Sequence, residues 1–237
     1  MTGKRTCLVV RPEPGCSRTA ARVGALASWW GVAVPLTERR ATEALRPSAA
    51  YDAIVLTSAA AAPYIAYLPQ DVPVHAIGKT TATAAREAGF PSVTVGMDGI
   101  PPAHGEELGR MLAASYAGRT LLYPCSEQRR PNLERAAGAG GVRILPWPVY
   151  RTVPIANGTH HLRNALSGPP DAVMLHAPSG AAALASAWPD EWLSATPTWL
   201  CLSMPISDAL PSHFRGERRI ASRRDEAAIM ELLMGPC

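Results

Sequence analysis

The chain repeats one pattern of apolar and polar positions six times. A short apolar run is followed by a turn of Ser, Thr, Gly or Pro and then by an Ala-rich stretch, and the turns begin near Arg11, Ser58, Gly78, Pro124, Pro178 and Ser203. A short apolar run bounded by such a turn is typical of a buried parallel strand, and the Ala-rich stretch is typical of the crossover helix. The pattern therefore predicts an α/β fold built on parallel sheets.

The same pattern predicts where the elements lie. The expected strands are 6–10, 32–36, 53–57, 74–77, 92–95, 120–123, 142–145, 172–175, 198–202 and 219–221. The expected helices are 17–30, 59–67, 80–88, 105–115, 128–137 and 225–234. Ser17 is placed to cap the first of these helices.

Two stretches interrupt the repeat and predict a division into two domains. The first is charged and runs from Thr37 to Pro47; the second, 146–154, contains three prolines, which exclude helix and favour extended backbone. We expect 1–36 plus 153–237 to form one domain and 40–148 an inserted one, with 37–39 and 149–152 as the connector. Each would be a parallel-sheet domain of flavodoxin-like or Rossmann-like type. Because such sheets bind ligands outside the carboxyl ends of their strands, the turns are expected to face one cleft between the domains.

The turns themselves are candidate binding sites for anions. The first N–H groups of a helix lack intrahelical partners, and Ser or Thr hydroxyls add further donors. Arg11 would bring a guanidinium to the end of the first strand, although an ordinary loop arginine has the same sequence signature. Ser58 could cap a helix, bind a ligand or do both. The segment Gly78-Lys79-Thr80-Thr81 lacks the upstream glycine of a phosphate loop, so no nucleotide site is expected there.

Composition narrows the class of ligand and the compartment. The chain has 237 residues, 47% of them apolar, and a formal net charge of +4, which suits an acidic small molecule better than a nucleic acid. Its paired arginines are scattered, as on solvated faces. The five cysteines form no Cys-x-x-Cys pair, which favours a reducing compartment. With no signal peptide or membrane span apparent, a cytoplasmic protein without nucleic-acid or membrane partners is expected.

Conventional catalytic motifs are missing from the sequence. His160 and His161 are adjacent and cannot share a helix face, and the remaining histidines, including His176, are isolated and interpreted as structural or surface residues. No Gly-x-Ser-x-Gly elbow occurs, and the glycines of 138–141 precede a strand rather than follow one. We therefore expect neither a metal nor a cofactor.

Taken in order, several short motifs resemble the uroporphyrinogen-III synthase family. They are Val10-Arg11-Pro12, Thr57-Ser58-Ala59, Ile77-Gly78 with Thr81, Tyr123-Pro124, Val149-Tyr150-Arg151-Thr152, Pro178-Ser179-Gly180 and Leu202-Ser203. The resemblance implies two α/β domains joined by a two-stranded connector. It also implies a polycarboxylate substrate, hydroxymethylbilane, which a monomeric, cofactor-free enzyme of tetrapyrrole biosynthesis closes into uroporphyrinogen III. The terminal hydroxyl leaves as water, a spirocyclic intermediate forms, and the last pyrrole ring is inverted.

The resemblance also implies roles for individual residues. Tyr150 becomes the candidate acid that assists loss of the hydroxyl, the alternative being a connector tyrosine anchored by packing. The candidate substrate-binding residues are Arg11, Ser58, Ala59, Gly78, Thr81, Ser126, Ser179, Gly180 and Ser203. The chain departs from the family pattern at Ala60, where many relatives have Asn, and around Pro205, which leaves open whether Ser203 or Ser207 is the matching serine.

Two other classes of function fit parts of the sequence. Two α/β domains around a cleft also describe a non-enzymatic module that binds a small anionic effector, but such a sensor has no need of the Val149-Tyr150-Arg151-Thr152 segment. A nucleotide-using α/β enzyme is disfavoured by the absence of the glycine fingerprint.

Overall fold

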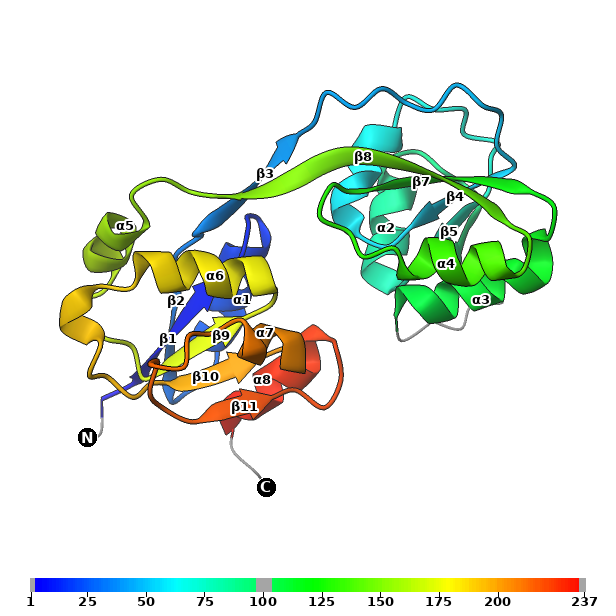
Figure 1. Ribbon diagram of the computed structural model, residues 1–237. Coiled ribbons are helices and arrows are strands. Elements are labelled where there is room, and N and C mark those ends of the chain that lie inside the picture. The colour runs from blue at the N-terminus through cyan, green and yellow to red at the C-terminus, as the bar shows by residue number, and fades with distance from the viewer. Residues whose placement is uncertain (1–2, 97–103, 235–237) are drawn as a thin grey trace. The chain divides into compact units, whose positions relative to one another are not determined.

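The chain forms two compact units. A computed structural model describes residues 3–96 and 104–234 (Figure 1). Unit 1 comprises Met1–Arg39 and Thr152–Cys237, and unit 2 comprises Arg40–Arg151. Cys237, one of the five cysteines counted in the sequence, lies outside the described residues.

Among the described residues, unit 1 is built on a five-stranded sheet in which neighbouring strands pair in parallel. Its spatial order is β11 (Arg218–Ile220), β10 (Thr198–Cys201), β9 (Ala172–Leu175), β1 (Arg5–Val10) and β2 (Trp29–Ala33). Numbered along the chain, this is the order 2-1-3-4-5 of flavodoxin-like sheets. The order reverses between β1 and β9, which marks the crevice where such sheets bind ligands.

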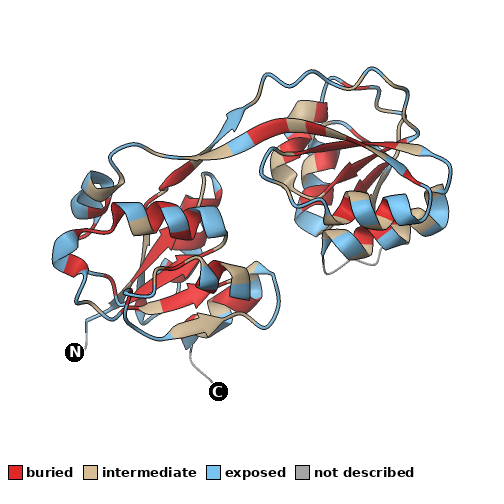
Figure 2. Cartoon of the chain, viewed as in Figure 1, coloured by how far each residue is buried: buried red, intermediate tan, exposed pale blue. Residues whose placement is uncertain are grey.

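Helices cover both faces of this sheet. Side chains alternate along β1, so Cys7 and Val9 pack with α1 (Gly15–Gly24) and α8 (Glu226–Met234). Leu8 and Val10 face the opposite core, which α5 (Gly158–Ala165), α6 (Pro178–Ala187) and α7 (Met204–Asp208) cover. A short 3-10 helix, η2 (Asp190–Trp192), follows α6. Because both faces are covered, β9 is apolar throughout and wholly buried, as are residues Cys7 to Val10 of β1 (Figure 2).

The second sheet, which has six strands in the described part of the chain, lies mostly in unit 2. Their order is β3 (Thr37–Ala41), β8 (Arg143–Pro154), β7 (Thr120–Ser126), β4 (Ala53–Leu56), β5 (Val74–Ala76) and β6 (Val93–Val95). From β4 to β8 the strands are parallel. Numbered from β4, they follow the Rossmann-like order 3-2-1-4-5, with the reversal between β4 and β7.

The second sheet is also covered on both faces. The 3-10 helix η1 (Ala59–Ile65) and α2 (Lys79–Glu87) pack with Ile54 and Leu56 of β4. On the other face, α3 (Gly105–Tyr116) and α4 (Asn132–Ala139) pack with Ala53 and Val55. The two predominantly parallel sheets confirm the predicted α/β fold class.

The prolines near residue 150 do not end a strand, contrary to the prediction of a strand at 142–145 and a separate connector. Instead, β8 runs unbroken from Arg143 to Pro154. Proline excludes helix but fits extended backbone, so the strand continues through Pro146 and Pro148. Backbone bonds from Ile155 to Leu36 and from Thr42 to Val149 show that the β3 segment runs antiparallel to it. The charged stretch after Thr37 therefore begins as a strand.

Several predicted helix bounds are wrong. The helix predicted at 17–30 ends at Gly24, because Trp29 is buried and Trp30 is exposed, an alternation that belongs to β2. Ser17 does not cap α1; its hydroxyl donates to the Glu13 carboxylate. The segment predicted as helix 59–67 is the 3-10 helix η1, which contains Pro63. Helix α5 was not predicted.

Within the described ranges, no helix has the length and apolar character needed to cross a bilayer.

Candidate functional site

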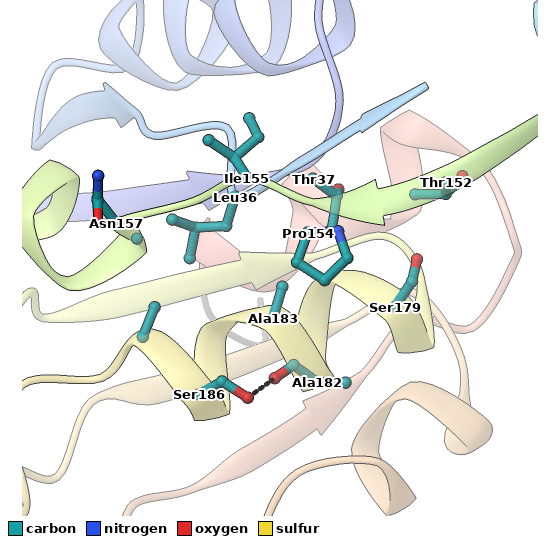
Figure 3. A pocket seen from close by; sticks show the side chains of 12 residues that line it. Leu36, Thr37, Thr152, Pro154, Ile155, Asn157, Ser179, Ala182, Ala183 and Ser186 are labelled. Atoms are coloured by element: carbon teal, nitrogen blue, oxygen red, sulfur yellow. Dashed lines mark hydrogen bonds between the residues drawn. The ribbon is translucent and has the colours of Figure 1, made fainter. Parts of the chain in front are cut away.

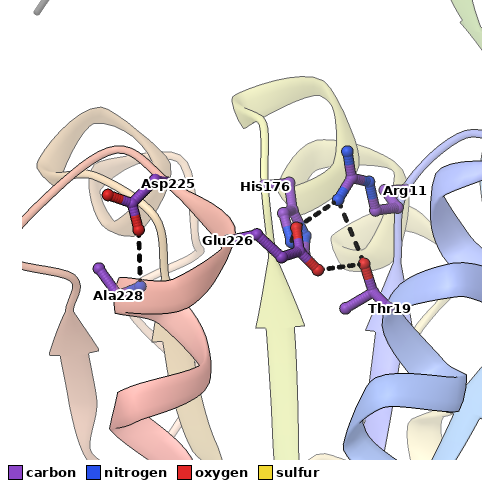
Figure 4. A network of polar contacts seen from close by, with 6 residues as sticks. All are labelled: Arg11, Thr19, His176, Asp225, Glu226 and Ala228. Atoms are coloured by element: carbon purple, nitrogen blue, oxygen red, sulfur yellow. Dashed lines mark hydrogen bonds and ion pairs between the residues drawn. The ribbon is translucent and has the colours of Figure 1, made fainter. Parts of the chain in front are cut away.

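Two loops of unit 1 bring charged or titratable side chains to the point where the strand order reverses. Arg11 directly follows β1, and His176 directly follows β9, the neighbouring parallel strand. The Arg11 Nη1 atom donates to Glu226 Oε2 at 2.9 Å and to Thr19 Oγ1 at 3.2 Å, and the Thr19 hydroxyl donates to Glu226 Oε1 (Figure 4). The Glu226 carboxylate, at the start of α8, thus links this helix to the loop after β1 and to α1.

His176 is the fourth member of this group. Its side chain is only 7% exposed, and its Nε2 lies 3.4 Å from Glu226 Oε2. Burial lowers the pKa of His176, although the Glu226 carboxylate acts in the opposite direction, so the imidazole is neutral at neutral pH. The structure therefore places His176, which stands alone in the sequence and was interpreted as a structural or surface residue, in the group around Glu226.

Glu226 carries the negative charge of the group. Burial disfavours its charged form, yet its contacts with His176 and Thr19 and the positive charge of Arg11 outweigh that effect and lower its pKa from 4.5 to about 2. The carboxylate therefore stays ionised over the whole physiological range and keeps Arg11 paired. Residues Thr19, His176 and Glu226 were missed as candidates. The signal that could have shown His176 is its position directly after a buried strand, as for Arg11.

Unit 1 also contains a cavity of about 400 Å³ along α6 (Figure 3). Its walls include Ser179, Ala183 and Ser186 from α6 and Leu36 and Pro154 from the two segments that leave the unit. Among the described residues, those that line it include no charged side chain. It thus suits an apolar or aromatic group better than a carboxylate, while Ser179 lies in the first turn of α6.

The strand order of unit 2 reverses between β4 and β7, and polar groups collect there as well. Thr57, which follows β4, shares a hydrogen bond of 2.8 Å with the Tyr123 hydroxyl of β7. Ser58 is the N-cap of η1, where its hydroxyl accepts from the Ala60 N–H, as the capping interpretation predicted. Ser126 ends β7 and pairs with Gln128. The carboxyl ends of β4 and β7 therefore both carry hydroxyl groups.

Tyr150 lies in β8 at an irregularity of the strand. Pro148 pairs with Cys125 and Tyr150 with Ser126, so Val149 is an extra residue, a β-bulge. Val149 and Tyr150 consequently pack into the same core, although neighbours in a regular strand point to opposite faces. The Tyr150 ring stacks on Tyr64 with centroids 6.4 Å apart, and Tyr150 is 7% exposed. No hydrogen bond of its hydroxyl occurs among residues 3–96 and 104–234.

The remaining predicted residues lie at the starts of helices. Gly78 is the N-cap of α2, and Thr81, which is buried, belongs to its first turn. Ala59 begins η1, Gly180 is buried in the first turn of α6, and Ser203 is the N-cap of α7 without a side-chain capping bond. Ser207, the alternative to Ser203, is buried, whereas Ser203 is half-buried. In the part of the chain that the structure describes, no three metal-ligating side chains form a group that could hold an ion.

Comparisons with known proteins decide the family. A family model described as "Uroporphyrinogen-III synthase HemD" matches residues 31–231, well over half of the chain. The chain belongs to the uroporphyrinogen-III synthase family. It is thus a cyclising lyase of tetrapyrrole biosynthesis that acts on hydroxymethylbilane, and the non-enzymatic effector module is not favoured.

Solved structures support the fold. The uroporphyrinogen-III synthetase of Helicobacter pylori is similar over 98% of both chains, with a TM-score of 0.67 and 14% identity. A mutant uroporphyrinogen III synthase of the extremely thermophilic bacterium Thermus thermophilus is similar over 97% of both chains, with a TM-score of 0.52 and 18% identity. At these identities the likeness shows the fold alone. A search of curated protein sequences found no significant match.

Proposed function

We propose that this chain closes hydroxymethylbilane into uroporphyrinogen III by holding the substrate's carboxylate arms at the carboxyl ends of its two sheets. The proposal rests on the reversal of strand order in each sheet, which has a guanidinium or hydroxyl groups beside it that could donate to a carboxylate. In unit 1 this group is the Arg11 guanidinium after β1. In unit 2 it is the hydroxyls of Ser58, after β4, and of Ser126, at the end of β7. Parallel sheets bind ligands at such points.

The other proposed contacts are backbone or hydroxyl donors at helix starts: Ala59, Gly78, Thr81, Ser179, Gly180 and Ser203. Free N–H groups in a first helical turn favour carboxylates, and the helix dipole adds to this attraction. Because Thr81 and Gly180 are buried, they would act through the backbone more than through a side chain. Binding many carboxylates at fixed points holds a flexible tetrapyrrole in the geometry that closes the ring.

Tyr150 is the proposed acid. Its hydroxyl would give a proton to the terminal hydroxyl of the substrate as that carbon–oxygen bond breaks and water leaves. The bridge-bearing carbon of the last pyrrole ring attacks the resulting cation to give the spirocyclic intermediate. The bond from that carbon to its original bridging methylene then breaks, the free carbon next to the ring nitrogen bonds to the released methylene, and the proton that this carbon loses returns to Tyr150. The β-bulge at Val149 supports this role, since bulges often redirect a side chain beside an active site. The lack of a hydrogen bond from Tyr150 to any described residue leaves its proton available.

Substituting Tyr150 with Phe tests this role. Phenylalanine preserves the packing on Tyr64 and removes only the hydroxyl. General-acid assistance is worth on the order of 100-fold or more, so we expect kcat for hydroxymethylbilane to fall by about that factor while KM stays within about twofold. Tyr64→Phe, which removes the hydroxyl of the stacked partner, is the matched control and should keep the wild-type kcat. A Tyr150→Phe enzyme with the wild-type kcat would exclude the acid role.

The proposal includes a monomeric enzyme in the cytoplasm whose partner is a small molecule rather than a nucleic acid. The free thiols Cys7, Cys16, Cys125 and Cys201 are all buried, as suits a reducing compartment. Burial raises the pKa of Cys7 to about 12 and that of Cys201 to about 11. Both thiols therefore stay protonated and unsuited to act as nucleophiles.

A further inference from the structure

Among the residues that the structure describes, the Arg11 side chain is held through one of its nitrogen atoms, Nη1. Both of its hydrogen bonds, to Thr19 and to Glu226, start from Nη1. Nε and Nη2 donate to no residue within the described ranges, and the Arg11 side chain is 24% exposed. The guanidinium thus has one edge fixed to the protein and one edge unoccupied (Figure 4).

The unoccupied edge lies beside the first residue of α1. A Cβ atom placed on Gly15 would be 2.6 Å from Arg11 Nε and 3.1 Å from Nη2, so only glycine leaves room for the guanidinium in this position. The Glu13 carboxylate nearby already accepts from the N–H and hydroxyl of Ser17. Glu13 is thus engaged elsewhere, and the Nε–Nη2 edge stays free.

The groups that hold Arg11 are themselves well fixed. Thr19 is 1% exposed and comes from α1, while Glu226 comes from the start of α8. The Glu226 carboxylate receives bonds at both oxygens, from the Thr19 hydroxyl at Oε1 and from Arg11 at Oε2. Two helices on one face of the sheet therefore determine where a loop arginine points.

We propose that Glu226 and Thr19 are positioning residues that present the Nε–Nη2 edge of Arg11 to one carboxylate arm of the substrate. An arginine edge with two parallel N–H groups matches the two oxygens of a carboxylate. Glu226 does not compete for this edge, because it bonds only to Nη1. The inference rests on the proposed function, in which Arg11 binds substrate.

Three single variants and their combinations test the proposal in the full-length enzyme. Arg11→Gln removes the two-donor edge but keeps an N–H that can bond Glu226, and KM for hydroxymethylbilane should rise roughly 10- to 100-fold. Glu226→Gln frees the arginine to sample other rotamers, so KM should rise roughly three- to tenfold with kcat nearly unchanged. Thr19→Val, which keeps the shape of the buried side chain, should raise KM in the same direction.

The double variant Arg11→Gln with Glu226→Gln shows whether Glu226 positions Arg11 or only supports the fold. If Glu226 acts through Arg11, Glu226→Gln adds nothing to KM in the Arg11→Gln background. If it only supports the fold, its effect on KM is the same in both backgrounds, and the positioning role is overturned. Thr19→Val gives the same comparison should Glu226→Gln fail to fold. Arg11→Gln with a wild-type KM would instead refute the binding role of Arg11 in the proposed function.

Discussion

At the scale of single residues, unit 1 depends on one partly buried ion pair that joins distant parts of the chain. Thr19 and Glu226 are separated by 207 positions, and Arg11 and Glu226 by 215. Replacing one member of such a pair by a neutral residue is destabilising, because the charge of the other member then stays partly buried without an opposite charge beside it. Glu226 should therefore matter for stability as well as for the orientation of Arg11.

The pH dependence of stability follows from the pKa of Glu226. Since that pKa is lowered from 4.5 to about 2, the native state gains stability above pH 4.5 and loses it as pH falls toward 2. Glu226→Gln should destabilise unit 1 by about 1–3 kcal/mol at neutral pH, and the difference from wild type should shrink below pH 4.5. Urea unfolding followed by tryptophan fluorescence measures it, because five of the six tryptophans lie in unit 1: Trp29, Trp30, Trp188, Trp192 and Trp199.

An exposed acid gives the control for this measurement. Glu43 lies in an exposed loop of unit 2, and Glu43→Gln should leave the unfolding transition of unit 1 unchanged at every pH. A Glu226→Gln difference that is equally large at pH 3 and pH 7 would contradict the described ion pair.

Sequence could identify Arg11 but not the residues that hold it. Arg11 follows an apolar run directly, and that local pattern reveals its place at a strand end. Thr19 and Glu226 come together only through the packing of α1 and α8 on one sheet face, which no local pattern encodes. The orientation of Tyr150 was equally inaccessible, because it depends on the bulge that pairs β8 with β7.

At the scale of elements, the strands were easier to predict than the helices. Strands buried on both faces are short apolar runs that stand out in the sequence. Helix bounds were harder to place because Ala-rich stretches continue past the turn that ends them. Trp29 and Trp30 illustrate the difficulty. The Trp29 ring is buried against α8, where its Nε1 donates to the Leu233 carbonyl, and both residues belong to β2 instead of the preceding helix. Propensity alone does not decide such a boundary.

The close packing of α3 on α4 leads to a prediction about two helical glycines. A Cβ on Gly109 would lie 2.6 Å from the Leu133 carbonyl oxygen and 2.8 Å from the Ala136 Cβ, so the helices would have to separate. Gly109→Ala should destabilise unit 2 by about 1–3 kcal/mol. Gly138, in α4, has nothing within 4 Å of the same position. Gly138→Ala should instead stabilise by about 0.5–1 kcal/mol through helix propensity.

Thermal unfolding monitored by far-ultraviolet circular dichroism compares the two glycine variants. The predicted shifts in Tm have opposite signs, with Gly109→Ala below wild type and Gly138→Ala above it. A Gly109→Ala protein as stable as wild type would show that the two helices do not approach as closely as described.

At the scale of the whole molecule, the two sheets have different strand orders but carry their polar side chains at the same kind of place, the reversal of strand order. One is flavodoxin-like and the other Rossmann-like, and each reverses its strand order where charged or hydroxyl side chains follow the strands. The repeated strand–turn–helix units predicted this fold class, and the order of the short motifs indicated the family to which the chain belongs. The strand orders themselves needed the structure, because sequence spacing does not specify which strands are neighbours.

The isomer of the product shows directly whether this chain inverts the last pyrrole ring of hydroxymethylbilane. Hydroxymethylbilane closes to the type I isomer without an enzyme, whereas inversion of the last pyrrole ring gives type III. The purified chain should be incubated anaerobically with hydroxymethylbilane, and the oxidised products separated by chromatography into their isomers. We expect type III to form in many-fold excess over the amount of protein and to dominate over type I. Type I alone, at the rate of the protein-free reaction, would contradict the account.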